Sequence, residues 1–454
     1  MKITCNFVHS QSKVYQSLIY YITNIKNNNM KRIFTLLTLC FLMAINVMAE
    51  RTGECGEHAK WDLKDDGTLI IYGYGDMNNY TQAYGSDIKN APWYGEKVSK
   101  VFIEYGITSV GDFAFNQCSL QSVQLSKSIK KIGKNAFAYC RNLTDITIPD
   151  NITEFGELAF AGCSSLKSIN LPNTITKLPM AFIAFCTQLE EVVIPNSVKK
   201  MGDMFFMSCE HLKSIKLPKN LTYIPSQSFY GCKNLETIDL PSSVTDLGTE
   251  VFTDCIKLKT IKLPDALNDI GARTFLGCSS LESITIPQNV KELNIEVFKY
   301  SGLKEVTIPD KIEYIGDEAF DGCKLTTLIL GKGLKEMGYQ AFGYNNKLTK
   351  IICNADIVPE THDSFMGVDC SKCTLIVPDN LFLKYYQNDL LEWWKFKPIL
   401  AYSTGIESIT NKQAQRTDVY TLEGKKVLTN TESIDINALA KGIYLFKGKK
   451  FVVK

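Results

Sequence analysis

The stretch Ile132-Gly133-Lys134-Asn135-Ala136-Phe137-Ala138-Tyr139-Cys140 returns further along the chain as Ile270-Gly271-Ala272-Arg273-Thr274-Phe275-Leu276-Gly277-Cys278. Segments of the form Leu-x-x-Ile-x-Leu-Pro lie between such stretches, as in Leu166 to Pro172. Together they make a unit of about 23 residues that repeats through most of the chain. Self-similarity at a period of this size predicts a solenoid, in which each unit forms one coil and buries its apolar face against its neighbours.

Three residue types recur in register within this unit. Cysteine fills one slot, with Ser301 and Asn345 as substitutes, at Cys118, Cys140, Cys163, Cys186, Cys209, Cys232, Cys255, Cys278 and Cys323. Phenylalanine, replaced once by Ile183, recurs at Phe115, Phe137, Phe160, Phe206, Phe229, Phe252, Phe275, Phe298, Phe320 and Phe342. Proline closes the extended part at Pro149, Pro172, Pro195, Pro218, Pro241, Pro264, Pro287 and Pro309. Each coil should therefore place the same residue type at the same point of the fold.

Each unit should contain one short strand. Ile169 and Leu171 alternate with polar residues, which is typical of a strand with one buried face. One strand per coil, stacked on the next, makes a parallel sheet. We therefore predict stacked short parallel strands, with turns or short helices on the other side. Glycines such as Gly133 and Gly156 should mark the tight turn, and the phenylalanine rings should stack in a column.

The cysteine slot could hold disulfides, metal ligands or structural thiols. Equivalent side chains of parallel coils point the same way, which sets their Cβ atoms about 4.8 Å apart, beyond the roughly 3.5 to 4.5 Å that disulfides favour. Cysteine, serine and asparagine side chains are all small and can hydrogen-bond a backbone carbonyl. We therefore predict that the nine cysteines are reduced, buried and structural.

The charges point to no nucleic acid or membrane partner. The chain has 50 basic and 48 acidic residues, a formal net charge of +2, so it has no strong long-range field. One row alternates in sign through successive coils, at Lys167, Glu190, Lys213, Glu236, Lys259, Glu282 and Lys304. A slip by one coil would set like charges side by side, so this row should fix the register of the stack.

The amino terminus carries the pattern of a secretory signal. Lys31 and Arg32 follow Met30, an apolar run extends to Val47, and small residues precede an expected cleavage near Ala49. We predict a signal peptide over residues 30–49, no membrane span after its removal, and a mature chain that is secreted or displayed on the outer membrane exterior. Residues 1–29 precede a complete signal, so translation is expected to start at Met30.

These repeats resemble the BspA-like leucine-rich repeats of Bacteroidetes surface proteins, whose units combine Leu-x-x-Ile-x-Leu-Pro with Ile-Gly-x-x-Ala-Phe-x-x-Cys. The resemblance implies a leucine-rich-repeat solenoid over residues 101–352, an amino-terminal cap over residues 50–100 and a carboxyl-terminal cap over residues 353–402. Such caps are common in that family, and we expect both to be rich in β-structure. It also implies adhesion to host or bacterial surface proteins or to glycans.

The end of the chain differs in composition from the repeats. Residues 403–416 are expected to be a linker, and residues 419–427 and 442–454 alternate in hydropathy around Gly-Lys turns, as hairpin strands do. Residues 417–454 resemble the carboxyl-terminal sorting domain of type IX secretion. They lack the usual opening Asn-Pro segment of that domain, and a plain capping β-domain is the alternative.

The sequence shows no catalytic or metal-binding constellation. Its histidines form no pattern with serine, cysteine or acidic residues, and they are His9, His58, His211 and His362. The pair Cys370 and Cys373 is not followed by the second pair that structural zinc requires. We therefore predict no enzyme activity, no cofactor and no metal. A disulfide between Cys353 and Cys373 or Cys370 would suit an exported cap.

Binding at the cell surface is the function that these features favour. The exposed positions of the strands are the candidate ligand contacts, and they are Gln124, Thr147, Asn170, Val193, Lys216, Asp239, Lys262, Thr285 and Thr307, with Ile329 beyond them. They share no chemical theme, so they name no ligand beyond a host or bacterial surface protein or glycan. A structural or spacer role in the cell envelope is the alternative, and a wide exposed apolar patch would favour binding over it.

Overall fold

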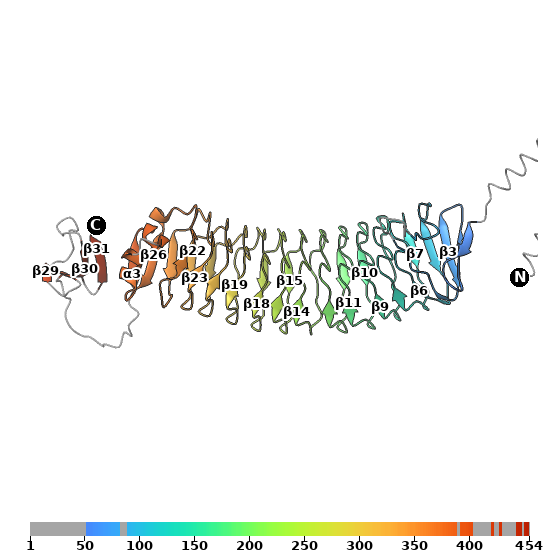
Figure 1. Ribbon diagram of the computed structural model, residues 1–454, viewed down its shortest axis with the longest axis horizontal. Helices are drawn as coiled ribbons and strands as arrows, with labels where there is room; N and C mark the ends of the chain where they lie inside the picture. The colour runs from blue at the N-terminus through green and yellow to red at the C-terminus, as the bar shows by residue number, and fades with distance from the viewer. Residues whose placement is uncertain are drawn as a thin grey trace, which may run out of the picture.

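The computed structural model describes residues 51–81, 89–387 and 391–402, and the backbone of four further strands between residues 419 and 453. From residue 51 to residue 402, coils of one kind stack along a single long axis, with a cap at each end (Figure 1). The predicted solenoid of stacked parallel strands is confirmed. The signal peptide, residues 1–29 and the linker 403–416 lie outside the described residues.

The first row of strands forms one long side of the solenoid. Equivalent residues pair in parallel register, so Ser168 pairs with Glu191 and Ile169 with Val192. The middle residue of each three-residue strand is buried and its neighbours are exposed, as the alternation predicted. The strands are β5 (Lys100–Ile103), β7 (Ser122–Gln124), β10 (Ser168–Asn170), β12 (Glu191–Val193), β15 (Thr237–Asp239), β17 (Thr260–Lys262), β20 (Glu305–Thr307), β22 (Thr327–Leu330), β24 (Lys350–Cys353) and β26 (Thr374–Pro378).

A second row of short strands runs beside the first, and the sequence pattern did not reveal it. Most of its members have two residues, too few to show a periodicity of their own. They are β4 (Gly75–Asp76), β6 (Ile107–Val110), β8 (Lys131–Ile132), β9 (Glu154–Phe155), β11 (Lys177–Leu178), β13 (Lys200–Met201), β14 (Tyr223–Ile224), β16 (Asp246–Leu247), β18 (Asp269–Ile270), β19 (Glu292–Leu293), β21 (Tyr314–Ile315), β23 (Glu336–Met337) and β25 (Glu360–Thr361). Turns complete each coil, and the described repeats contain none of the short helices allowed for.

The turns bind neighbouring coils on a third side. The amide of Phe137 donates to the Ala159 carbonyl at 2.8 Å, and that of Tyr139 donates to the Ala161 carbonyl at 2.7 Å. Gly133, which precedes the turn of its coil, has a different role from the one predicted. Gly133 does not have a positive φ, but a Cβ there would come within 2.4 Å of Asp112 Oδ1. Glycine is therefore needed for the close approach of two coils, while Tyr139 takes the left-handed conformation, with φ of 58°.

The phenylalanine rings stack in a column, as predicted, with centroids 5.2 Å apart for Phe115 and Phe137 and 5.3 Å for Phe275 and Phe298. The column steps sideways where Ile183 fills the phenylalanine slot. Phe182 takes its place, meets Phe160 edge to face at 5.5 Å and stacks on Phe205 of the next coil. Phe205 then meets Phe206, which returns the column to its usual position. The interior is thus filled continuously through a break in the sequence pattern.

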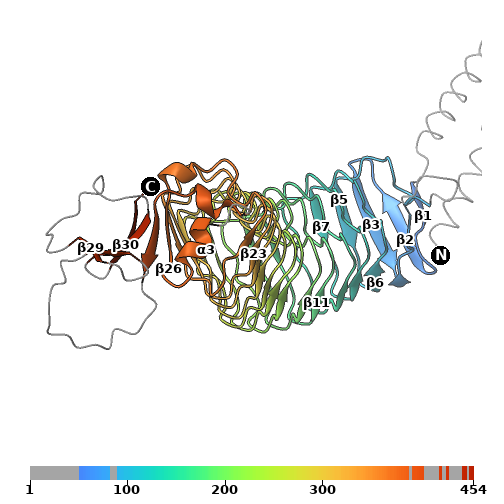
Figure 2. The ribbon, with the colours of Figure 1, turned by 60° about the vertical axis from the view of Figure 1, so that its left-hand side comes forward.

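Two caps close the ends of the column. At the amino end, β1 (Thr52–Glu54), β2 (Ala59–Leu63) and β3 (Thr68–Gly73) pair in antiparallel order. β3 also pairs in parallel with β5, which links the cap to the first row of strands. The buried Trp93 stacks on Phe115, and its Nε1 donates to the Ala114 carbonyl at 2.8 Å. At the carboxyl end, α3 (Phe382–Gln387), η1 (Cys370–Lys372), η2 (Glu392–Lys395) and β27 (Ile399–Tyr402) cover the last coils (Figure 2). There Trp393 packs edge to face on Phe365.

The last strands form a separate antiparallel sheet in the order β29-β28-β30-β31. Their bounds are β28 (Val419–Thr421), β29 (Lys426–Leu428), β30 (Gly442–Phe446) and β31 (Lys449–Val453). The hairpins predicted for this part of the chain are therefore present. The domain boundaries and the sorting role stay predictions.

Candidate binding face

The nine candidate contacts lie on one exposed face of the solenoid, one from each successive coil. Pairing places Asn170 beside Val193 and Asp239 beside both Lys216 and Lys262, so the candidates form a continuous row. Val193 is 64% exposed, which is high for an aliphatic side chain on a sheet. Ile329 continues the row but is half-buried. Whether this row contacts a ligand stays a prediction.

A second exposed row runs parallel to the candidates and was not singled out from the sequence. Each member lies two residues before a candidate, because alternate residues of a strand share a face. Most of its members carry hydroxyl groups, and in order along the solenoid they are Ser122, Asp145, Ser168, Glu191, Ser214, Thr237, Thr260, Ser283 and Glu305. The alternation that revealed the first row was therefore a sufficient signal for the second. Together the two rows give the face a polar surface.

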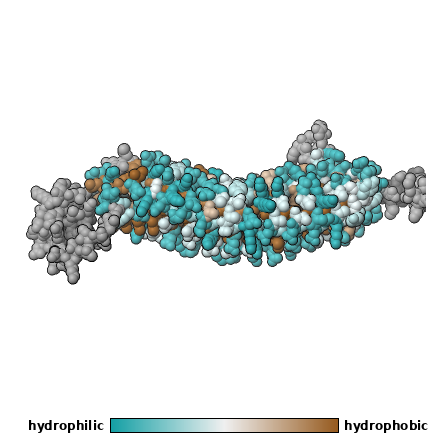
Figure 3. All heavy atoms as spheres, turned by 90° about the horizontal axis from the view of Figure 1, so that it is seen from below, coloured by the Kyte–Doolittle hydropathy of each residue, from teal (hydrophilic) through white to brown (hydrophobic). Residues whose placement is uncertain are grey.

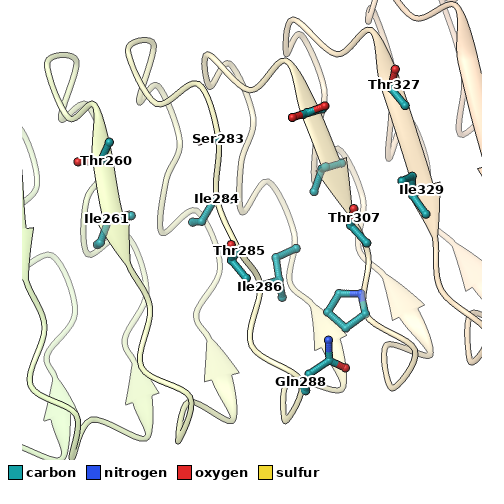
Figure 4. A pocket seen from close by; sticks show the side chains of 13 residues that line it. Thr260, Ile261, Ser283, Ile284, Thr285, Ile286, Gln288, Thr307, Thr327 and Ile329 are labelled. Atoms are coloured by element: carbon teal, nitrogen blue, oxygen red, sulfur yellow. The ribbon is translucent and has the colours of Figure 1, made fainter.

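The first row of strands is interrupted where residues 283–286 cross it. Neither β17 nor β20, on either side, pairs with this segment, and within the described structure no backbone hydrogen bond is formed by residues 283–286. The N–H and C=O groups of these residues are therefore free to bind another partner. Figure 4 shows the segment running as coil between the arrows of its neighbours. Ile284 is half-buried here, whereas the equivalent Val306 in the next coil is buried.

A shallow depression of about 470 Å³ lies over this interruption. Residues from four successive coils line it, and Figure 4 shows Thr260, Thr285, Thr307 and Ile329 arranged along it. Five of the lining residues carry hydroxyl groups, and Ile284 adds apolar surface between them. A second depression of about 610 Å³ lies at residues 214–219 and 239–242, where the ladder is reduced to one bridge. These two depressions thus lie where the pairing of the first row is broken or reduced.

Two neighbouring pairs in the row of alternating charges form ion pairs between coils. Lys259 Nζ lies 2.9 Å from a carboxylate oxygen of Glu236, and Lys304 Nζ lies 2.7 Å from Glu282. The hydrogen bond from Lys259 lowers the pKa of the Glu236 carboxyl. All four side chains are about half exposed or more, so each pair contributes little on its own.

The cysteine slot is occupied by free thiols, eight of them buried and Cys118 half-buried. The eight buried thiols donate to the carbonyl at the phenylalanine slot of the preceding coil, as Cys140 Sγ does to Phe115 at 3.1 Å and Cys232 Sγ does to Phe206 at 3.2 Å. Burial raises the pKa of the Cys232 thiol to about 12. These thiols are therefore protonated and unreactive at neutral pH.

The predicted disulfide of the carboxyl-terminal cap is wrong. Cys353, Cys370 and Cys373 are all free thiols, and Cys353 Sγ lies 3.2 Å from the hydroxyl of the buried Tyr385. The pairing was expected from the exported context alone, which does not fix where the side chains point. Instead, Cys353 belongs to the last paired strands and packs beneath α3 through Tyr385.

The part of the chain that the structure describes holds no cluster of three or more histidine, cysteine or acidic side chains that could bind a metal ion. In that same part, no helix is both long enough and apolar enough to cross a membrane. On the side seen in Figure 3 hydrophilic residues dominate, and apolar residues occur in small groups, some of them toward the carboxyl-terminal cap.

Comparison with protein families places this fold in a known class. The model of the BspA type leucine rich repeat region matches residues 86–213, 179–304 and 293–388, which together exceed half of the chain. The chain therefore belongs to the BspA-type leucine-rich-repeat family. No curated protein matches the sequence.

Solved structures of bacterial proteins share the fold. A leucine-rich repeat protein from Bacteroides ovatus is 25% identical, with a TM-score of 0.55, over 77% of this chain and 99% of that protein. A leucine rich cell surface protein from Faecalibacterium prausnitzii is also 25% identical, over 66% of this chain and 93% of that one, with a TM-score of 0.44. The chain thus shares its fold with the Bacteroides ovatus protein over most of its length.

Proposed function

We propose that the protein is an adhesin-like binding protein that works outside the cell, through the strand face of its solenoid. The depression at residues 283–286 carries this proposal, because it joins unpaired backbone groups to hydroxyl side chains and to the half-buried Ile284. Concave sites with a few convergent polar groups are where proteins usually hold ligands. The ligand class that this supports is a surface protein or a glycan of the host or of other bacteria.

A solenoid presents this site in a rigid form. Thr285 and Thr307 come from coils that are held together by the aromatic column and by the turn ladder, so the site loses little conformational entropy when a ligand binds. Rigid scaffolds with exposed polar side chains suit the recognition of extended partners.

The test is a binding screen of residues 50–454 against matrix proteins, mucins and a glycan array. The variant Thr285→Lys with Thr307→Lys fills the depression with two long charged side chains, and Gln188→Lys with Asn346→Lys adds the same charge at exposed turns outside the depression. Saturable binding that the first pair abolishes and the second keeps would support the proposal. Binding that is unaffected by the first pair would place the site elsewhere, and no binding by the folded chain would favour the envelope spacer.

Export and surface display are further parts of the proposal. The pattern of residues 30–49 supports cleavage near Ala49, and the antiparallel sheet of β28 to β31 supports a sorting role for residues 417–454. Expression in a Bacteroidetes host, with and without residues 417–454, tests both parts. Protease added to whole cells should digest the full chain, and removal of the last residues should leave it protected inside the cell. Equal digestion of both forms would favour a plain capping domain.

A further inference from the structure

Two large aromatic side chains stand exposed on the strand face near the amino-terminal cap. Phe102, in β5, is 39% exposed, and Tyr105, three residues further on, is 83% exposed. Phe102 pairs with Ile70 of β3 on one side and with Gln124 of β7 on the other, so it lies in the same row as the candidate contacts. Further along that row, the exposed side chains are polar, charged or aliphatic, and Phe102 is its aromatic member.

The turn that carries Tyr105 is fixed from two directions. The Gly106 amide donates to Ser128 Oγ at 3.1 Å, and the Gly106 carbonyl accepts from the Gly75 amide at 2.9 Å. Gly106 has φ of 114°, and a Cβ there would come within 2.3 Å of the Gly73 carbonyl oxygen. The backbone at Tyr105 is thus held in place by the cap and by the next coil. An exposed ring on a fixed turn costs little entropy to use in binding.

Polar groups surround the two rings. Phe102 and Tyr105 line a shallow depression of about 700 Å³ together with Thr68, Glu104, Ile70, Gln124 and Ser126. The lining therefore offers hydroxyl groups, one carboxylate and one amide beside aromatic faces, with no basic side chain among its members. An anionic ligand would meet Glu104 with no cation to balance it, so a neutral ligand fits better. An extended apolar peptide would leave these polar groups without partners.

We propose that this depression is a second binding site, which takes the neutral sugar rings of a glycan. The C–H face of a pyranose packs on an aromatic ring, and its hydroxyl groups can donate to Glu104 and exchange hydrogen bonds with Gln124 and Thr68. Phe102 and Tyr105 supply the apolar contact, and the other three supply orientation. This inference rests on the proposed role in surface binding, but it does not depend on the depression at residues 283–286.

The experiment uses residues 50–454 on a printed array of neutral and acidic oligosaccharides, followed by titration calorimetry with the best soluble neutral oligosaccharide. The test variant is Phe102→Ala with Tyr105→Ala. The matched control is Tyr223→Ala with Tyr344→Ala, which removes two exposed aromatic side chains that are not among the candidate contacts. The test variant should weaken binding by at least about tenfold, because it loses both aromatic contacts, while the control should bind as the parent does. The parent, the test variant and the control should unfold at the same thermal midpoint, so that a loss of binding is not a loss of fold.

Three results would overturn the inference. The first is that the test variant binds a neutral glycan as tightly as the parent does. The second is that the parent prefers acidic glycans. The third is that the folded parent binds no glycan on the array. A chain that binds a matrix protein through residues 283–307 and leaves the array empty would refute the glycan site alone. Loss of glycan binding in Thr285→Lys with Thr307→Lys, and not in the test variant, would instead place the sugar in the other depression.

Discussion

Asn345 donates a hydrogen bond of 2.9 Å from Nδ2 to the carbonyl oxygen of Phe320. In the preceding coil, Cys323 Sγ makes the same bond to Phe298 at 3.1 Å. Two side chains with different chemistry therefore do the same work, which is to bind one coil to the carbonyl of the coil before it. The slot selects for a small buried donor rather than for sulfur.

A substitution at Cys232 tests this interpretation. Serine keeps a donor for the Phe206 carbonyl and alanine does not, while their volumes are similar. We expect Cys232→Ser to be more stable than Cys232→Ala by about 1 kcal/mol, which is the usual net value of one hydrogen bond. Urea unfolding of the two variants gives the difference. If alanine proves the more stable residue, the slot needs apolar volume and the bond contributes nothing.

The buried thiols should make the protein less stable in alkali. The pKa of Cys232 is raised from 9.0 to about 12, and the same holds for Cys163. Because a raised pKa means that the folded state holds the proton more tightly, this stability is fully present below pH 9.0 and is lost as pH rises toward about 12. Between these limits the unfolding free energy should fall less steeply with pH in Cys232→Ser than in the parent. The two slopes should differ by about 1.4 kcal/mol per pH unit, which is the contribution of one proton. Urea unfolding of the parent and of Cys232→Ser at a series of pH values from 8 to 11 measures the two slopes. Equal slopes would contradict the burial of this thiol.

Reversal of one charge should disturb the alternating row. Glu236→Lys removes the ion pair with Lys259 and places three lysines side by side, with Lys213 as the third. We expect a small fall in the thermal midpoint that shrinks at high salt, because the side chains are exposed and their repulsion is screened. Adding Lys259→Glu restores an opposite pair and should recover part of the loss. A fall that is independent of salt would mean that packing, and not charge, is responsible.

The step in the aromatic column predicts a compensating pair. Phe182 is fully buried, so Phe182→Ala should cost about 3 to 5 kcal/mol. Adding Ile183→Phe puts a ring back at the usual slot, between Phe160 and Phe206, and should recover part of this cost. Ile183→Phe alone should destabilise, because it adds volume beside Phe182. Urea unfolding of the two single variants and the double variant gives the three changes in unfolding free energy. If the change in the double variant equals the sum of the two single changes, the two side chains do not compete for one space.

The repeated features of the fold could be predicted from the sequence, because the residues that form each feature recur in about ten units. The strand at Ile169, the aromatic column and the buried cysteines follow from spacing and alternation alone. The second row of strands could not be read, since two residues such as Lys177 and Leu178 carry no period. The sideways step at Phe182 could not either, because both Phe182 and Ile183 are apolar and only packing decides which ring joins the column.

The candidate face was predicted more easily than the sites on it. Strand alternation marks Thr285 and Thr307 as exposed, but nothing in Ser283 to Ile286 distinguishes this segment from the paired strand at Thr260 to Leu263. The missing pairing of this segment is seen only once the coils are stacked. Tyr105 likewise lies outside the repeat pattern, and its fixed exposure depends on contacts of Gly106 with the cap and the next coil.

The hydrogen bonds between coils have a mechanical consequence, because they join each coil to the next along the length of the molecule (Figure 1). A pull applied between the two ends loads these links in series, so every coil carries the same force and the weakest junction yields first. In the first row of strands, two such junctions lie where residues 145–148 and residues 283–286 lack backbone partners. A protein anchored at one end and holding a ligand at the other would lengthen coil by coil under shear, and would give way gradually instead of snapping.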